Sequence, residues 1–241
     1  MTDSADNEGL DIAGFGKIAK AIPAKVYERS ATTLLTTFQQ VTAPITETTS
    51  GLGRYLKQKF DNMVEAEKAI ATYTVEKAVS RAKERAQRAG RLLQPPASSK
   101  AFVNAIEEAS KETDPLLHEM WANLIASQLS DETSHPHFVE VLSHFSSAEA
   151  RLLTELVPRS EVGENNGGYF LANDDAFKYW IARTGGELRP WSISCVLLQE
   201  FRFADVIAPK DGKPEDTAIL FRTAQGSAFL SAVTPPLGTE G

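Results

Sequence analysis

The chain has 241 residues, of which 42% are hydrophobic and 24% are charged, so it can form one large or two modest domains with a real core. Its net charge of −7 is uneven: residues 1–100 carry 15 Lys and Arg against 11 Asp and Glu, and residues 101–241 carry 10 against 21, which disfavours nucleic acid held along most of the surface. The acidic start is not typical of a secretory signal, and no run approaches the ~20 apolar residues of a membrane span. The one cysteine, Cys195, excludes an internal disulfide. We therefore expect a cytoplasmic protein.

The chain is expected to begin with a disordered leader at 1–11, followed by a helical N-terminal region at 12–93. Within this region, apolar residues recur at helical spacing over 14–22, with lysines on the opposite side. This pattern predicts a short amphipathic helix that is able to make peripheral contact with a membrane.

Two prolines, Pro23 and Pro44, are expected to limit the next helix to about 24–42, because proline breaks the helical hydrogen-bond ladder. The segment from Leu52 to about Leu93 then reads as one long helix, since it has an apolar side, no proline and, after Gly53, no glycine before Gly90. Such a helix needs to be paired with others or supported by charge.

The end of this long helix carries a run of cations, which is the best binding signal in the sequence. Arg81, Arg85 and Arg88 share one side of a helix. One interpretation is a solvated helix face with partial charge compensation; the other is a contact to nucleic acid, anionic lipid or an acidic partner, including the second half of this chain. The candidate binding surface consists of Lys77, Arg81, Arg85, Arg88 and Arg91.

Residues 98–157 are expected to form a compact helical core, separated from the long helix by the proline break QPPASS at 94–99. Ser98 or Ser99 caps a helix over about 100–112, and Asp114 caps the next one. Pro136 opens a further helix, and the capping box of Ser146 with Glu149 starts the last.

The remainder is expected to form an α+β unit at 158–234 that resembles a winged helix, before a tail at 235–241. After a loop, VGENNGG, the segment DDAFKYWIARTGG is predicted to be a short helix, and Pro190 to Phe201 another. The runs ADVIAP and DTAILFRT predict a β-hairpin, and TAQGSAFLSAV a final helix. The fold class predicted for the whole chain is therefore mainly α, with this winged-helix-like unit at its C-terminal end.

All four histidines lie within 114–153, which raises the question of a metal or catalytic centre. Zinc sites need three or four ligands at defined spacings, and neither HExxH nor a pair of cysteines is present. His137 and Glu140 are three residues apart and can meet on a helix, whereas His118 is expected at the rim of an apolar face and Cys195 in a buried apolar run. Nucleophile and phosphate-loop motifs are absent, so we expect no catalytic residue, metal or cofactor.

Three segments together resemble the bacterial abortive-infection alpha family: AIPAKVYE, then ETDPLLHEMWANLIAS, then HPHFVEVLSHFSSAEARLL. The closing TAQGSAFLSAV is similar to the end of the same family, so the resemblance covers residues 12–233. It implies a role in defence against phage, by halting or killing the infected cell, and carries over no catalytic residue. The motif residues that we interpret as structural are Trp121, Asn123, His135 and Pro136.

The resulting hypothesis is a phage-defence protein that acts through protein or membrane contacts rather than catalysis. A protein partner or self-association is expected. Two alternatives stay open: a DNA-binding regulator that uses the winged-helix-like unit, although the helix PWSISCVLLQEFRF offers few cations, and a cryptic metal-dependent hydrolase or nuclease built on His135, His137 and nearby carboxylates.

Overall fold

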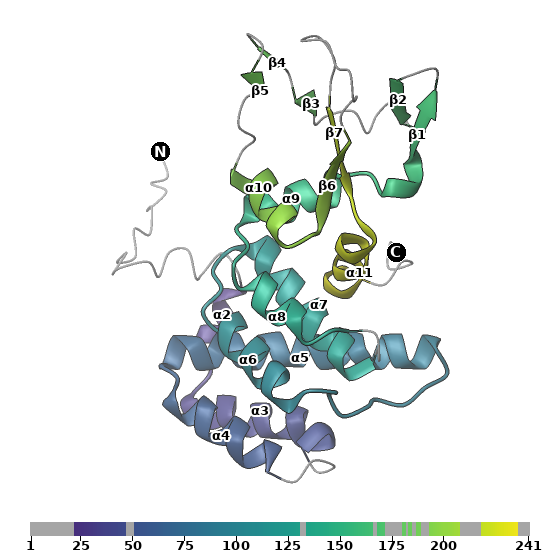
Figure 1. Ribbon diagram of the computed structural model, residues 1–241. Coiled ribbons are helices and arrows are strands. Elements are labelled where there is room, and N and C mark those ends of the chain that lie inside the picture. The colour runs from purple at the N-terminus through teal and green to yellow at the C-terminus, as the bar shows by residue number, and fades with distance from the viewer. Residues whose placement is uncertain are drawn as a thin grey trace, which may run out of the picture. The chain divides into compact units, whose positions relative to one another are not determined.

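The computed structural model describes residues 22–46, 51–130, 134–165, 168–171, 180–181, 183–184, 187–188, 193–207 and 218–235 (Figure 1). The protein is mainly α, as the sequence predicts. The chain divides into two compact units, unit 1 at 1–132 and unit 2 at 133–241. This division falls inside the core predicted at 98–157, and the predicted domain boundaries stay predictions. The leader at 1–11 and the helix at 14–22, except Ile22, lie outside the described residues, as does the tail after Pro235.

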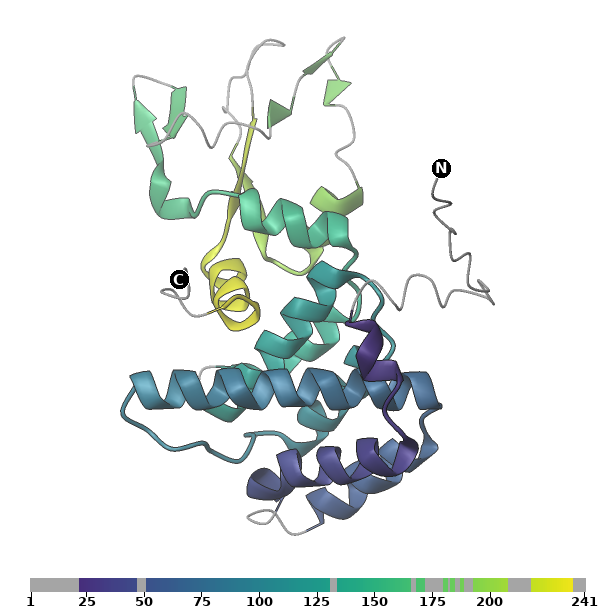
Figure 2. The ribbon, with the colours of Figure 1, turned by 180° about the vertical axis from the view of Figure 1, so that it is seen from behind.

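Unit 1 is a bundle of helices around α5. In two opposite views, α3 and α4 lie on one side of α5 and α7 lies on the other (Figure 1, Figure 2). The described helices of this unit are α2 (Ala24–Tyr27), α3 (Ala31–Thr46), α4 (Leu52–Asn62), α5 (Glu65–Arg88), α6 (Ser99–Ala109) and α7 (Pro115–Ser130).

The single long helix predicted over 52–93 is wrong, because α4 ends at Asn62 and α5 begins at Glu65. Met63 and Val64 are extended, and the Glu67 carboxylate accepts the Val64 N–H at 3.2 Å, which caps the new helix. The break lets α4 fold back along α3, where the rings of Phe38 and Phe60 stack with centroids 4.3 Å apart. Tertiary burial therefore decides this boundary, which no proline or glycine marks.

The prediction for 24–42 is also corrected. The segment forms two helices, α2 and α3, and α3 continues through Pro44 to Thr46. A proline this close to a helix end removes one backbone hydrogen bond. Ile45 is 2% exposed, so its burial helps to hold the last turn in place.

Both predicted caps of unit 1 are confirmed. The Ser98 hydroxyl accepts the Ala101 N–H at 3.2 Å at the start of α6. The Asp114 carboxylate accepts the N–H groups of Leu116 and Leu117, at 2.9 and 3.1 Å, at the start of α7. These bonds satisfy helix N–H groups that have no partner within the helix, and so fix where α6 and α7 begin.

Unit 2 combines helices with short antiparallel strands. The strand order is β3-β7-β6 in one sheet, and β1-β2 and β4-β5 form separate pairs. In the main pair, Ala204 lies opposite Arg222 and Ile207 opposite Ile219. The elements are α8 (His137–Leu142), α9 (Ser147–Glu155), η1 (Arg159–Glu161), β1 (Val162–Asn165), β2 (Gly168–Leu171), β3 (Trp180–Ile181), β4 (Arg183–Thr184), β5 (Glu187–Leu188), α10 (Ile193–Glu200), β6 (Ala204–Ile207), β7 (Ala218–Arg222) and α11 (Ala224–Val233).

The core of unit 2 is aromatic. Phe203 and Phe229 stack with centroids 4.6 Å apart, and Phe138 and Phe145 each approach Phe229 at 5.3 Å. Gly226, on α11, is required here, because a Cβ on it would lie 2.2 Å from the carbonyl oxygen of Phe203. The glycine and phenylalanine of the TAQGSAFLSAV segment thus have packing roles.

The predicted hairpin of ADVIAP with DTAILFRT, the helix ending near Phe201 and the final helix are confirmed, as is the Ser146–Glu149 capping box. Two predictions are wrong: VGENNGG is not a plain loop but contributes to the β1-β2 pair, and residues 180–181 and 183–184 of the expected helix form the strands β3 and β4. In these segments the backbone N–H and C=O groups form hydrogen bonds between strands, and not within the helix or loop that the sequence pattern predicts. The likeness to a winged helix stays a prediction.

Candidate functional site: a polar seam between α5 and α7

A continuous row of polar side chains runs between α5 and α7 in unit 1. We call this row the seam. Most of its members recur three or four residues apart along each helix, so they lie on the side of that helix that faces the other one. Its members are Tyr73, Thr74, Lys77, Arg81 and Arg85 on α5, and His118, Glu119, Asn123 and Ser127 on α7.

Glu119 is the centre of charge in the seam. Its carboxylate accepts hydrogen bonds from the Lys77 ammonium and, at 2.5 Å, from the Arg81 guanidinium. Burial raises the pKa of Glu119, but the bonds from Lys77 and Arg81 outweigh burial and hold this pKa below its ordinary value. The Lys77 ammonium also lies 5.7 Å from the centre of the Tyr73 ring. Two of the five predicted surface cations therefore pair within the protein.

His118 is buried, with 1% of its surface exposed, and not at the rim of an apolar face as predicted. Its Nε2 lies 2.7 Å from the Thr74 hydroxyl, which also lies 2.7 Å from the Ile70 carbonyl oxygen. Because a carbonyl only accepts, the hydroxyl proton points to Ile70 and the imidazole Nε2–H donates to Thr74. The Tyr73 ring stacks on the imidazole at 5.8 Å, which helps to explain the burial.

The charge state of His118 follows from this position. Burial and the neighbouring Lys77 ammonium lower the pKa of His118 to about 4. The imidazole is therefore neutral near pH 7, and its Nδ1 has no hydrogen-bond partner among the described residues. A hydroxyl beside an imidazole resembles a nucleophile with its base, but Thr74 is 0% exposed, so the pair is closed to any substrate.

The rest of the seam binds backbone and side chains of α7. The Asn123 amide donates to the Glu119 carbonyl oxygen at 3.0 Å, and the Ser127 hydroxyl donates to the Asn123 carbonyl oxygen at 3.2 Å. Arg85 donates to the Ser127 hydroxyl at 3.1 Å. These contacts lie inside one helix pair and tie α5 to α7.

Trp121 anchors the other side of α7. It is 2% exposed, and it donates a hydrogen bond to the Glu112 carboxylate. That carboxylate also accepts the N–H groups of Thr113 and Asp114, at 2.8 and 2.7 Å, in the turn between α6 and α7. Burial raises the pKa of Glu112, because these bonds compensate only part of its loss of hydration.

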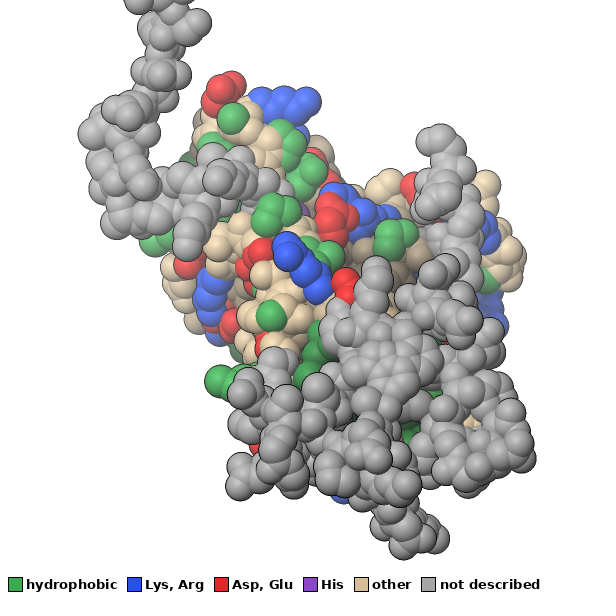
Figure 3. Space-filling model, turned by 90° about the horizontal axis from the view of Figure 1, so that it is seen from above, with side chains coloured by type: hydrophobic (Ala, Val, Ile, Leu, Met, Phe, Trp, Pro, Cys, Tyr) green, Lys and Arg blue, Asp and Glu red, His purple; other side chains and the backbone are tan. Residues whose placement is uncertain are grey.

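The last two cations of the candidate surface, Arg88 and Arg91, are exposed. Helical spacing places Arg88 on the same side of α5 as Arg81 and Arg85. Arg81 and Arg85 contact α7, however, whereas Arg88 is exposed. On the face drawn in Figure 3, the described positive and negative side chains are interspersed rather than gathered into fields of one sign.

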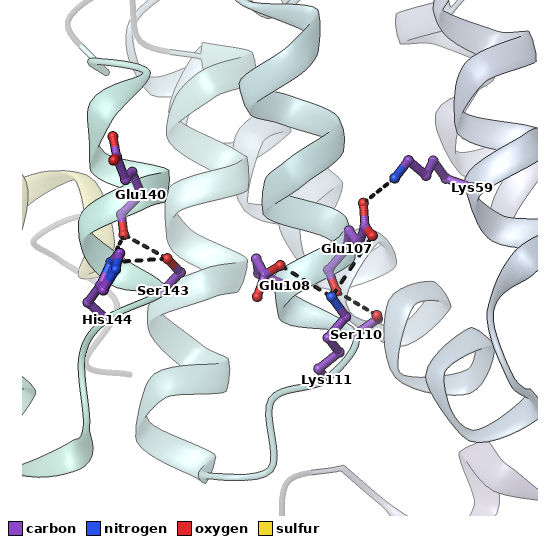
Figure 4. A network of polar contacts seen from close by, with 8 residues as sticks. All are labelled: Lys59, Glu107, Glu108, Ser110, Lys111, Glu140, Ser143 and His144. Carbon is purple, nitrogen blue, oxygen red and sulfur yellow. Dashed lines mark hydrogen bonds and ion pairs between the residues drawn. The ribbon is translucent and has the colours of Figure 1, made fainter.

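A second polar cluster joins α4 to α6. Lys59 donates to the Glu107 carboxylate at 2.8 Å, and Lys111 approaches Glu107 at 3.9 Å and Glu108 at 3.2 Å (Figure 4). Hydrogen bonding to Glu107 raises the pKa of Lys59. An open pocket of about 200 Å³ borders this cluster, and its charges are already paired with one another.

The remaining histidines lie in unit 2 and do not converge on a metal centre. His137 Nδ1 meets Glu140 at 3.1 Å, as the spacing allows, and His135 Nδ1 accepts the His137 N–H at 3.2 Å at the start of α8. His144 Nδ1 lies 2.7 Å from the Glu140 carbonyl oxygen (Figure 4). No group of three or more His, Cys, Asp or Glu in the described part of the chain is arranged to hold a metal ion. Cys195, expected in the core, is half-buried.

Sequence reasoning missed Tyr73, Thr74 and Glu119 as members of the seam. A signal was available, because Thr74, Lys77 and Arg81 recur every three to four residues on α5, and His118 precedes Glu119 directly. Only the packing of α5 on α7 shows that these two sets face each other. Across the described residues, no helix combines the length and apolar character needed to cross a membrane.

The seam and the start of α8 lie within a region that a known family shares. Residues 66–182 match the family described as abortive infection alpha, which confirms the resemblance predicted from the sequence. The match includes Trp121, Asn123, His135 and Pro136. The wider extent expected, over residues 12–233, stays a prediction. No curated protein and no solved structure matches the chain.

Proposed function

We propose that this protein takes part in phage defence by abortive infection, and that it acts through contacts with other molecules rather than by catalysis. The observation that carries the proposal is the family match over residues 66–182. All of α7, and all of α5 except Glu65, lie inside this region, and so does the Trp-Ala-Asn motif. The family name supports the defence role, and the mode of action is our inference from the site.

The closed state of the seam supports contacts over catalysis. His118 and Thr74 are the two described groups that most resemble a catalytic pair, and neither reaches solvent. The Glu119 carboxylate forms ion pairs with Lys77 and Arg81. Each of these groups stabilises the packing of α5 on α7, and the outer surface is left for partners.

The direct test is phage challenge of bacteria that express the full chain, at low and high ratios of phage to cells. We expect cultures to survive at the low ratio and collapse at the high ratio, with a reduced phage yield in both. Growth and plaque numbers equal to those of an empty vector, across several phages and with the protein present in the cells, would contradict the defence role of the chain alone.

Two variants test the mode of action in the same assay. Thr74→Val removes the hydroxyl but keeps the shape of the side chain, and we expect defence to persist wherever the folded protein accumulates. The pair His137→Gln and Glu140→Gln, on the exposed face of α8, should also leave defence intact. Loss of defence in a variant that is folded and abundant would favour a catalytic mechanism, and retention of the protein on random duplex DNA at low salt would favour the DNA-binding regulator.

A further inference from the structure

The end of α5 and the turn after it form an exposed tip, defined as residues 88–92. Both arginines of the tip are exposed, and Leu92 is 86% exposed, the largest value among the exposed large hydrophobic residues. In two opposite views the chain leaves the end of α5 in a wide loop before it returns to α6 (Figure 1, Figure 2). A single exposed leucine is common on protein surfaces, so its meaning here comes from the fixed turn that presents it and from the cations beside it.

The tip is held in place by backbone hydrogen bonds on both sides. The Arg91 N–H donates to the Ala86 carbonyl oxygen at 2.8 Å, and Gly90 adopts a left-handed φ of +65°, which ends the helix. The Gln94 N–H donates to the Leu129 carbonyl oxygen at 2.9 Å, on α7. Leu92 is therefore presented by a fixed turn and not by a free tail.

The charge around the tip has one sign over a long stretch of sequence. No Asp or Glu occurs from Arg85 to Ile106, in a chain whose net charge is −7. Lys83 and Glu84 are both exposed, and Glu84, one turn before Arg88 on α5, is the last acid before the tip. Asp131 and Glu132, which follow α7, lie outside the described residues.

We propose that the tip docks the protein on an anionic lipid surface. In this arrangement Leu92 enters the boundary between headgroups and acyl chains, while Arg88 and Arg91 lie at the lipid phosphates. An exposed leucine that follows two exposed arginines in the chain fits an interface that is both anionic and apolar. Nucleic-acid binding usually rests on more cations than this tip provides.

This inference names a partner surface and does not depend on the role in phage defence. It is tested with the purified full-length chain, so a failure here is distinguishable from a failure in phage challenge. The assay is flotation with vesicles of phosphatidylcholine, either alone or mixed with phosphatidylglycerol. We expect flotation only with the anionic vesicles, and weaker flotation as salt is raised, because salt screens the contact.

Three variants locate the contact. Arg88→Gln with Arg91→Gln should lower the partition coefficient roughly 25-fold, since each cation near an anionic surface contributes roughly fivefold. Leu92→Ser should weaken binding but keep its salt dependence. The matched control is Lys57→Gln with Lys111→Gln, which removes the same amount of charge. Both lysine side chains are about half exposed and pair with carboxylates, so this variant should float like the wild type.

Each contrary result overturns the proposal. If the control loses as much binding as the arginine variant, only net charge matters. If binding survives in the arginine and leucine variants but disappears on deletion of residues 1–22, the contact lies in the N-terminal segment. If no vesicle floats the protein, and duplex DNA or RNA retains it through Arg88 and Arg91, the tip is a nucleic-acid contact. Circular dichroism and the melting temperature of each variant confirm that the fold is unchanged.

Discussion

The two halves of the cationic run on α5 differ sharply in their surroundings. Lys77 and Arg81 pair with Glu119, and Arg85 donates to Ser127, so the first half holds α7. Arg88 and Arg91, one to two turns later, are exposed. The same residue types, at the same helical spacing, are thus internal ties in one place and surface charges in the next.

The difference arises from α7 and not from α5. α7 places a carboxylate opposite Lys77 and Arg81, and a hydroxyl opposite Arg85, but the chain leaves α5 at Arg88. Whether a run of cations can bind a partner therefore depends on the side chains that face it, and not on the number of cations in the run.

The largest effect is expected on the far side of α7. Trp121→Ala should lower the free energy of unfolding by about 3–5 kcal/mol, because it leaves a cavity and removes the donor to Glu112. Urea unfolding measures this loss. Tyr55→Ala, at a tyrosine that is 44% exposed, is the control and should cost much less. Equal losses in the two variants would show that α7 does not anchor unit 1.

The next effect is a pH dependence caused by His118. Because the pKa of His118 is about 4 in the folded protein and about 6.5 when unfolded, stability is present above the unfolded pKa and is lost as the pH falls towards the folded pKa. The difference in unfolding free energy between the wild type and His118→Gln should change by roughly 3 kcal/mol from pH 7 to pH 4. His137→Gln is the control and should show the wild-type decline. A difference that stays constant with pH would mean that His118 is not buried as described.

A smaller effect is expected at Glu119. Glu119→Gln leaves two cations without their carboxylate, and it should cost about 1 kcal/mol near pH 7, since Glu119 is 42% exposed on its side chain. The pKa of Glu119 is lowered, so this contribution is present above the unfolded pKa and is lost as the pH falls through the folded pKa. Urea unfolding of both proteins at neutral and strongly acid pH should show the difference disappear in acid. A difference that grows in acid would contradict the pairing.

The smallest effect belongs to the tip. Arg88→Gln with Arg91→Gln should change the free energy of unfolding by about 0.5 kcal/mol, because both side chains are exposed and only Arg88, in the last turn of α5, is stabilised by the helix dipole. Thermal melts of this variant and of Glu119→Gln, compared at one pH, sharpen the contrast between the two halves of α5. A large loss at the tip would show that its arginines have a structural role.

The sequence by itself determined the features that depend on residues close together in the chain, such as helix caps and the hairpin. The caps at Ser98, Asp114 and Ser146, the hairpin that includes Ala204 and Arg222, and the meeting of His137 with Glu140 all follow from residues a few positions apart, or from a repeated pattern with turn residues between. The family resemblance also rests on contiguous motifs, and the match over residues 66–182 confirms it.

Only the tertiary structure decided where α4 ends and what faces α5. The break at Met63 and Val64 carries no proline or glycine, and it forms because α4 buries its apolar side by folding back on α3. The burial of His118 and the engagement of Lys77 and Arg81 depend on side chains about 40 residues away, which no spacing rule reaches. Packing between distant segments, and not the local pattern, sets which charges remain for a partner.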